Sequence, residues 1–150
     1  MPQAKLAVLA REDGYLVESD RLTGVTKIYS TAGLEIEFLI GKVGAGLEDA
    51  LKTNLGVTAQ ALRHMETLKR FAVTVDYEGL KVNIPSPEAY VVHKMTVNHE
   101  RGKKQEKDAQ AIERLWPYLD REKLGAVFAS LAKKERSYAN AFMEEHHLAL

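Results

Sequence analysis

The sequence contains no cysteine among its 150 residues. This absence excludes disulfides, thiolate zinc sites and a thiol nucleophile, and it is compatible with a reducing compartment. The chain also has no excess of either charge, because 21 Lys and Arg balance 21 Asp and Glu. Overall charge therefore predicts no attraction to nucleic acid or to an anionic membrane. Any attraction to phosphate must be local.

Long hydrophobic runs are also missing. No apolar run approaches the roughly 18 residues that a membrane-spanning helix needs, and the segment MPQAKLAVLARED lacks the long apolar core of a signal peptide. We therefore expect a cytoplasmic protein with no membrane partner. A hydrophobic content of 45% is enough for one sizeable core at this length. We expect one domain over residues 1–150, with a sheet-rich part at 1–84 and a helical part at 85–150.

The first part reads mainly as short strands. After a short helix at residues 3–12, three strand-like segments separated by turn residues predict an antiparallel meander; they are Tyr15–Ser19, Val25–Ser30 and Leu34–Ile40. The apolar positions Leu47, Ala50 and Leu51 suggest a further short helix, and residues 57–68 are ambiguous. Glu78-Gly79 separates two alternating segments, 71–77 and 80–84, and predicts a hairpin, because Gly tolerates the positive φ of a two-residue turn.

The second part reads as helices. Ser86 and Pro87 suit the cap and first position of a helix that runs to about Glu100. Gly102 breaks it, and a second helix follows from about Lys103 to Trp116. Two more helices are predicted, one capped by Asp120 with a core stripe and one carrying aromatic residues; they contain Leu124, Val127, Phe128 and Leu131, and Tyr138, Ala141 and Phe142. The fold class is α+β, a small antiparallel or mixed sheet followed by about four bundled helices.

Cations cluster where the first two of these helices meet. Lys94 and Arg101 are seven residues apart and share a face if the helix stays regular that far, and three lysines follow, namely Lys103, Lys104 and Lys107. Such side chains donate charge-assisted hydrogen bonds to phosphate oxygens. Asp108 can pair with Lys104 along the helix or reach back to Lys94. The alternative is a solvated helical hairpin whose charges only keep it soluble.

The same region resembles bacterial nucleotidyltransferases of the DNA-polymerase-β superfamily. Their helix "P-x-P/E-x-(aromatic)-x-x-H-K" is followed by Arg and then by "K-D-x-x-Q"; the corresponding residues here are Pro85, Pro87, Glu88, Tyr90, His93, Lys94, Arg101, Lys107, Asp108 and Gln110. Upstream, LEIEFLIGKVGAG resembles the strand and glycine-bearing loop of the family, and NLGVTAQALRHMETL resembles its connecting segment. The resemblance covers about residues 14–115 and implies a nucleotidyltransferase-like fold.

The resemblance implies transfer of a nucleotidyl group from a nucleoside triphosphate by two Mg²⁺ ions held on three carboxylates. Glu37 stands where the family has its third carboxylate, and Glu35 lies two positions earlier on the same face, so both are candidate catalytic and metal-binding residues. The Gly-Ser and D-x-D motifs that supply the other carboxylates are absent from the sequence. The alternative is a half-buried strand with Leu34, Ile36 and Phe38 inward and both glutamates in water.

Three hypotheses follow from these patterns. The first is a catalytically degenerate nucleotidyltransferase-like protein that binds a nucleotide or phosphate through Lys94, Arg101, Lys104, Lys107 and Asp108. The second is an active Mg²⁺-dependent enzyme whose site is completed by a partner chain. The third is a non-catalytic module whose exposed sheet edge pairs with itself or with another protein, giving a homo-oligomer or a complex. The cationic cluster alone fits a free nucleotide, RNA or an acidic protein.

Overall fold

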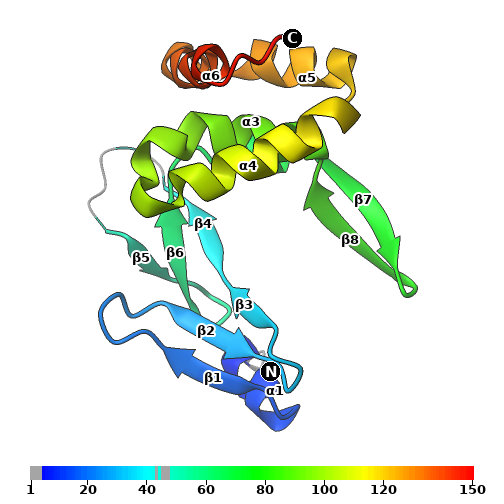
Figure 1. Ribbon diagram of the computed structural model, residues 1–150. Helices are drawn as coiled ribbons and strands as arrows, with labels where there is room; N and C mark the ends of the chain where they lie inside the picture. The colour runs from blue at the N-terminus through cyan, green and yellow to red at the C-terminus, as the bar shows by residue number, and fades with distance from the viewer. Residues whose placement is uncertain (1–4, 43, 45–47) are drawn as a thin grey trace. The chain divides into compact units, whose positions relative to one another are not determined.

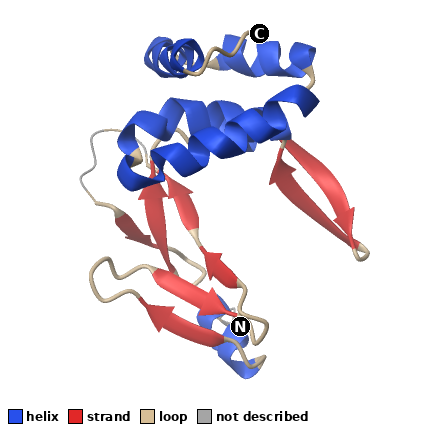
Figure 2. Cartoon of the chain, viewed as in Figure 1, coloured by secondary structure: helices blue, strands red, loops and turns tan. Residues whose placement is uncertain are grey.

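The computed structural model describes residues 5–42, 44 and 48–150 (Figure 1). The chain divides into two compact units, residues 1–63 and residues 64–150, which we call the N-terminal unit and the helical unit. Short strands make up most of the first, and the second joins a strand hairpin to helices (Figure 2). The α+β class predicted from the sequence is confirmed. The prediction of one domain over residues 1–150 stays a prediction.

The N-terminal unit begins with helix α1, Leu6–Glu12. Three strands then form the predicted antiparallel meander in the order β1-β2-β3; their bounds are Leu16–Ser19, Thr26–Tyr29 and Glu35–Glu37. The first turn is held by Asp20, whose Oδ1 accepts hydrogen bonds from the backbone N–H groups of Leu22 and Thr23. A short polar side chain that satisfies backbone donors in this way is what favours a turn at this point.

A second sheet in this unit corrects two of the sequence predictions. Strand β6, Thr58–Leu62, pairs in parallel with β4, Leu39–Gly41, and antiparallel with β5, Ala50–Lys52. The strand predicted over residues 34–40 is therefore two strands, in different sheets. The helix predicted from Leu47, Ala50 and Leu51 is wrong at its last two positions, and Leu47 lies outside the described residues. Short apolar runs of this kind fit the periodicity of a helix and that of a strand equally well, and pairing with β6 makes this one a strand.

The helical unit starts with α2, Glu66–Arg70, and the predicted hairpin of β7, Ala72–Tyr77, and β8, Leu80–Pro85. Glu78 and Gly79 form its turn with φ of 50° and 83°, and two successive positive φ values match the twist of the flanking strands. Asp76 Oδ1 accepts the Gly79 N–H at 3.0 Å. The hairpin is confirmed as predicted, and it leads directly into the first long helix.

Four helices follow, as predicted. Helix α3, Pro87–Val97, is capped by Ser86, whose Oγ accepts the Ala89 N–H. It ends earlier than expected, and 3₁₀ turns at Asn98–Glu100 and Gly102–Lys104 replace regular helix before α4, Gln105–Leu115. A third 3₁₀ turn, Trp116–Tyr118, contains Pro117 and leads to α5, Arg121–Ser130, and α6, Lys133–Glu145. The Asp120 carboxylate caps α5 as predicted.

The core of the helical unit is built around α3, which packs against α4, α5 and α6 (Figure 1). Its buried side chains include the stripe predicted for α5, which extends to Leu131 just after that helix, and residues from the other three helices and the 3₁₀ turn at Trp116; the core contains Val91, Val92, Met95, Ala109, Ile112, Trp116, Leu124, Val127, Phe128, Leu131, Ala139 and Phe142. None of the helices in the described residues is long and apolar enough to cross a membrane. The packed α3–α4 hairpin thus supports the polar groups at the turn that joins its two helices.

Candidate phosphate site and carboxylate pair

One buried carboxylate joins the two cations that the sequence singled out. Asp108 accepts a hydrogen bond from Lys94 Nζ on Oδ1 at 2.9 Å and from Arg101 Nε on Oδ2 at 2.8 Å. The Asp108 side chain is 7% exposed, while those of Lys94 and Arg101 are 17% and 31% exposed. We call these three residues the charge triad. Of the two partners that the sequence allowed for Asp108, the structure selects Lys94 and adds Arg101.

The seven-residue spacing of Lys94 and Arg101 on a helix does not explain how the triad forms. Because α3 ends at Val97, Lys94 and Arg101 do not lie on one regular helix. The chain turns through Gly102, whose φ is +52°, a conformation that is easiest for glycine. Asn98 Nδ2 also donates to the Gln105 carbonyl at 3.1 Å and ties the two sides of the turn together. The turn, with Asp108 on α4, brings the two cations to one place.

The electrostatics of the triad favour an ionised carboxylate. Burial raises the pKa of Asp108, but the hydrogen bonds from Lys94 and then Arg101 outweigh burial and hold this pKa below its ordinary value. Lys94 Nζ also lies 5.5 Å from the centroid of the Tyr90 ring, within the range of a cation–π contact. Two positive charges on one negative charge leave the triad with a net positive charge. It can still attract an anion.

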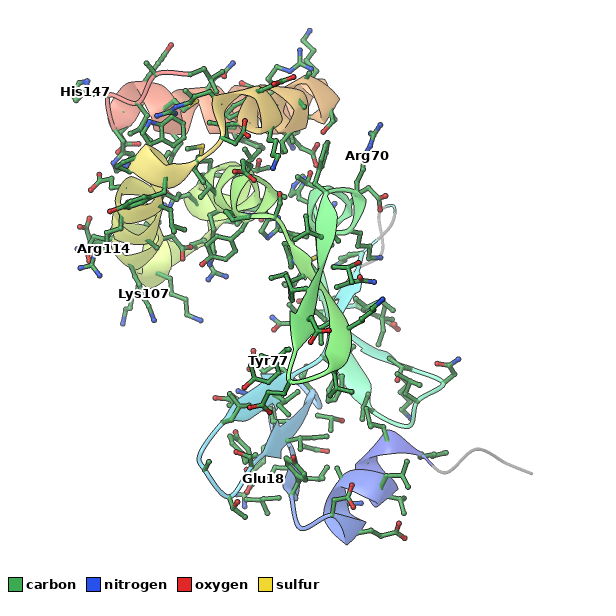
Figure 3. All side chains as sticks on the ribbon, turned by 90° about the vertical axis from the view of Figure 1, so that its right-hand side faces the viewer. Glu18, Arg70, Tyr77, Lys107, Arg114 and His147 are labelled. Carbon is green, nitrogen blue, oxygen red and sulfur yellow. The ribbon has the colours of Figure 1, made fainter. Side chains whose placement is uncertain are left out.

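The three lysines of the cluster are exposed. Lys103, Lys104 and Lys107 have no ion pair within the part of the chain that the structure describes. Figure 3 shows Lys107 pointing away from α4 into solvent. The pairing of Lys104 with Asp108 that the sequence allowed does not form, because Asp108 points back toward α3 and is occupied there. These lysines are free to contact a ligand.

The two candidate catalytic carboxylates lie on β3 in the N-terminal unit. Glu35 Oε1 and Glu37 Oε1 are 2.6 Å and 2.8 Å from Lys27 Nζ. Lys27 is paired directly opposite Glu37 on β2, and its hydrogen bond lowers the pKa of Glu35. Hydrogen bonds to Glu35 and Glu37 in turn raise the pKa of Lys27. Both carboxylates are 43% exposed and share a single ammonium group.

The strand that carries these glutamates is not half-buried as one alternative predicted. Leu34 and Ile36 are 63% and 36% exposed, and Phe38 lies between β3 and β4 with intermediate burial. Alternation along a strand predicts which side chains share a face but not whether another layer covers that face. The inward position expected for Leu34 and Ile36 is therefore wrong in this structure.

Comparison with known proteins supports the resemblance. The sequence profile described as Nucleotidyltransferase matches residues 1–136, which is most of the chain and includes both the carboxylate pair and the charge triad. The chain belongs to this nucleotidyltransferase family. No curated protein and no solved structure matches it. Family membership alone does not say which parts of a nucleotidyltransferase site this chain has, and that depends on its residues.

Membership of this family implies Mg²⁺, and the acidic residues of the chain can be compared with the ligands that this ion requires. Mg²⁺ requires near-octahedral oxygen ligands, of which carboxylates supply one or two and substrate phosphates and water the rest. Within the described residues no three or more His, Cys, Asp or Glu side chains form a group that could hold a metal. Glu35 and Glu37 are adjacent on one face but already bind Lys27. These residues do not make a two-metal site on their own.

Two histidines and a glutamate form a contact network that the sequence did not predict. His64 has a positive φ of 62°, and its Nδ1 lies 2.7 Å from Glu135 Oε1 on α6. Its carbonyl oxygen is 3.0 Å from His93 Nδ1. His93 is half-buried, and burial lowers its pKa while the hydrogen bond to His64 opposes that shift. No local pattern marks His64, because its conformation depends on α3 and α6.

Proposed function

We propose that this protein binds the phosphate groups of a nucleotide on the surface formed by Arg101, Lys103, Lys104 and Lys107, and that it does not transfer a nucleotidyl group by itself. The observation that carries the proposal is the way Asp108 holds Arg101. Nε is the nitrogen through which Arg101 donates to the Asp108 carboxylate, and within the described residues the two terminal nitrogens of Arg101 have no hydrogen-bond partner. A guanidinium held in this way presents two parallel donors to a phosphate.

Local charge supports the same ligand. Residues 94–108 contain five cations and three carboxylates, a net charge of +2 in a chain whose overall charge is zero. Asp108 is buried and Lys94 is mostly buried, and the charges that remain accessible are four cations and two carboxylates, again a net charge of +2. Because opposite charges raise the local concentration of an anion, a phosphate would gather here despite the neutral whole. Lys94 acts as a positioning residue, since it binds Asp108 and fixes the carboxylate that holds Arg101.

The carboxylate pair supports the second half of the proposal. Glu35 and Glu37 would have to release Lys27 before binding Mg²⁺, and the metal would need further ligands beyond them. The alternative is an active Mg²⁺-dependent enzyme whose remaining carboxylates come from a partner chain. In that case Glu37 and Glu35 would be the residues through which this chain takes part.

Binding is tested with ATP, GTP, CTP, UTP and tripolyphosphate by isothermal titration calorimetry. Arg101→Ala should weaken binding of each ligand by at least about tenfold, because it removes charge-assisted hydrogen bonds worth about 1.5–3 kcal/mol. Arg114→Ala is the matched control, since Arg114 is an exposed arginine on α4, the helix that carries Asp108, and lies outside the cluster (Figure 3). Equal effects of the two variants, or no binding of any of the five ligands by the wild type, would contradict the proposal.

Catalysis is tested separately by transfer of label from an α-labelled nucleoside triphosphate with Mg²⁺. We expect no transfer by the purified chain. Transfer that survives Glu18→Gln but is lost in Glu37→Gln would establish the active alternative instead. Glu18 is a suitable control because it lies opposite Lys27 on β1 of the same sheet and is exposed.

The β7–β8 hairpin favours a second candidate function, self-association. Its register places six apolar side chains in three directly opposed pairs on one face; the pairs are Val73 with Ile84, Val75 with Val82, and Tyr77 with Leu80. Five of the six are 40–67% exposed, and the hairpin has no third strand in the described residues. A two-stranded hairpin is marginal alone. A second copy of the chain can cover this face with an identical one.

Sedimentation velocity over a concentration series tests self-association. We expect a monomer–dimer equilibrium that Val82→Lys shifts to monomer by placing a charge on the apolar face. Asn83→Lys is the control, because Asn83 is on the same strand and faces the other way, where its side chain accepts from Thr74. A wild-type protein that stays monomeric at the highest concentration would rule out this candidate without affecting the phosphate site.

A further inference from the structure

A cavity of about 460 Å³ opens in the helical unit between the α3–α4 turn and α6. Its apolar lining comes from Met95 and Ala109 of α3 and α4 and from Phe142 of α6, and Asn98 and Glu106 are among its polar residues. This volume lies within the range of small-molecule sites, which combine an apolar lining with a few polar groups. Neither the family match nor the charge triad assigns an occupant to it.

Aromatic rings dominate one side of the cavity. His99 and Tyr138 are stacked with ring centroids 3.7 Å apart, and Phe142 and His146 are stacked at 4.2 Å. All four residues line the cavity. Tyr138 and Phe142 are four residues apart and therefore lie on one face of α6, and His146 follows directly after the end of that helix. Two ring stacks on one wall form a surface on which a planar heterocycle can stack.

The cavity is continuous with the cationic surface. Gly102 and Lys103 both line it, and they directly follow Arg101, whose terminal nitrogens are the proposed phosphate donors. Lys103 therefore belongs to the cavity and to the cationic surface at the same time. A ligand with a planar ring at one end and phosphates at the other would satisfy both features.

We infer that this cavity takes the base of the nucleotide whose phosphates bind Arg101 and Lys103. The inference rests on the proposed function and adds the part of the ligand that the triad does not address. The base stacks on the rings at the cavity surface, of which His99 is exposed and Tyr138 and His146 are partly exposed, while Phe142 belongs to the core and supports His146. The Asn98 side chain offers its oxygen to the base edge, because its Nδ2 is already used by the Gln105 carbonyl.

The decisive variant fills the cavity without touching the cations. Ala141 lines the cavity on α6 and is exposed, so Ala141→Trp places a large side chain inside it. Asn140→Trp is the matched control, because Asn140 is exposed on the same helix and lies outside this cavity. His99→Ala is a second variant that removes one ring of a stack and adds no bulk. Circular dichroism of each variant verifies that the helices are intact.

Each variant is titrated with ATP, GTP and tripolyphosphate. Ala141→Trp and His99→Ala should weaken binding of at least one of the two nucleotides about tenfold, as expected for loss of one base–aromatic stack. Both should leave tripolyphosphate within about twofold of the wild type, since it has no base. Arg101→Ala should weaken nucleotides and tripolyphosphate alike.

The outcomes separate this inference from the proposed function. If Ala141→Trp and His99→Ala bind both nucleotides as tightly as Asn140→Trp while Arg101→Ala does not, the base site is refuted and the phosphate site stands. If the wild type binds neither nucleotide nor tripolyphosphate, the phosphate site fails and this inference fails with it. Equal weakening of nucleotide and tripolyphosphate by Ala141→Trp would also refute the base site, because the effect would not depend on the base.

Discussion

Two three-residue charge clusters in the described residues have opposite charge arrangements: one has two cations around a carboxylate, and the other has two carboxylates around a cation. On the α3–α4 hairpin one carboxylate, Asp108, holds two cations, and its side chain is 7% exposed. On the β2–β3 pair one cation, Lys27, holds Glu35 and Glu37, which are both 43% exposed. The first cluster is net positive and centred on a buried carboxylate, whereas the second is net negative and centred on a partly exposed ammonium group.

This difference decides what each cluster contributes. Breaking a buried ion pair is costly because the remaining charge loses its partner in a medium of low polarity. An exposed pair is solvated before and after it breaks, so its loss costs little. The ion-pair distances are similar in the two clusters, but the pairs therefore contribute different free energies to stability. We expect the triad to fix a local structure and the Lys27 cluster to affect stability only slightly.

The largest effect should come from removing Asp108. Asp108→Ala leaves Lys94 and Arg101 without their shared acceptor, and we expect it to lower the free energy of unfolding by about 3 kcal/mol. Urea denaturation of the variant and wild type measures the loss. Glu106→Ala on the same helix is the control, because Glu106 is exposed and bonded only to Gln110. If Asp108→Ala loses no more free energy of unfolding than Glu106→Ala, the triad does not differ in energy from an exposed charge cluster.

Lowering the pH should weaken the interaction of Asp108 with Lys94 and Arg101 in the wild-type protein and reduce its stability. The folded-state pKa of Asp108 lies below its ordinary value of 3.8, so its stabilising contribution is complete above that value and is lost as the pH falls through the lowered pKa. Asp108→Asn should lack this contribution at neutral pH and show a shallower loss of stability in acid. Denaturation midpoints between about pH 2 and pH 6 test this, and parallel pH profiles for the two proteins would contradict it.

His93 lies beside the triad and should also make stability depend on pH, with a smaller effect than Asp108. Burial lowers its pKa below the ordinary value of 6.5, and the nearby charges of Lys94 and Arg101 act in the same direction. The unfolded chain therefore binds a proton first as the pH falls below 6.5, so stability is full above that value and decreases through the lowered pKa. Titration of the His93 ring signals by NMR should give a pKa below the ordinary value of 6.5; a pKa at or above that value would show that the site is hydrated.

The smallest effect should come from the N-terminal cluster. Lys27→Ala should shift the unfolding midpoint of the protein less than Asp108→Ala does, because its three charged groups are in contact with solvent. The remaining difference from wild type should shrink further between about 0.05 M and about 1 M NaCl, since salt screens exposed charges. A loss as large as that of Asp108→Ala, and insensitive to salt, would mean that Lys27 is covered in solution.

Local sequence signals predicted the elements that local interactions determine. The Ser86-Pro87 start of α3, the Asp120 cap of α5 and the Glu78-Gly79 turn were found because each depends on neighbouring residues alone. The meander of β1, β2 and β3 follows from its turns in the same way. The order and spacing of residues from Pro85 to Gln110 also indicated the family, which the profile match over residues 1–136 confirms.

Tertiary structure decided the rest. The sequence placed Lys94 and Arg101 on one helix, but the chain turns after Val97, and only the packing of α4 beside α3 shows that Asp108 is their common partner. It could not show that Leu34 is exposed or that Ala50 pairs in a strand. Burial and pairing depend on which segments come together in space, and short amphipathic segments do not encode that choice. The residue types came from the sequence, and their shared environment came from the fold.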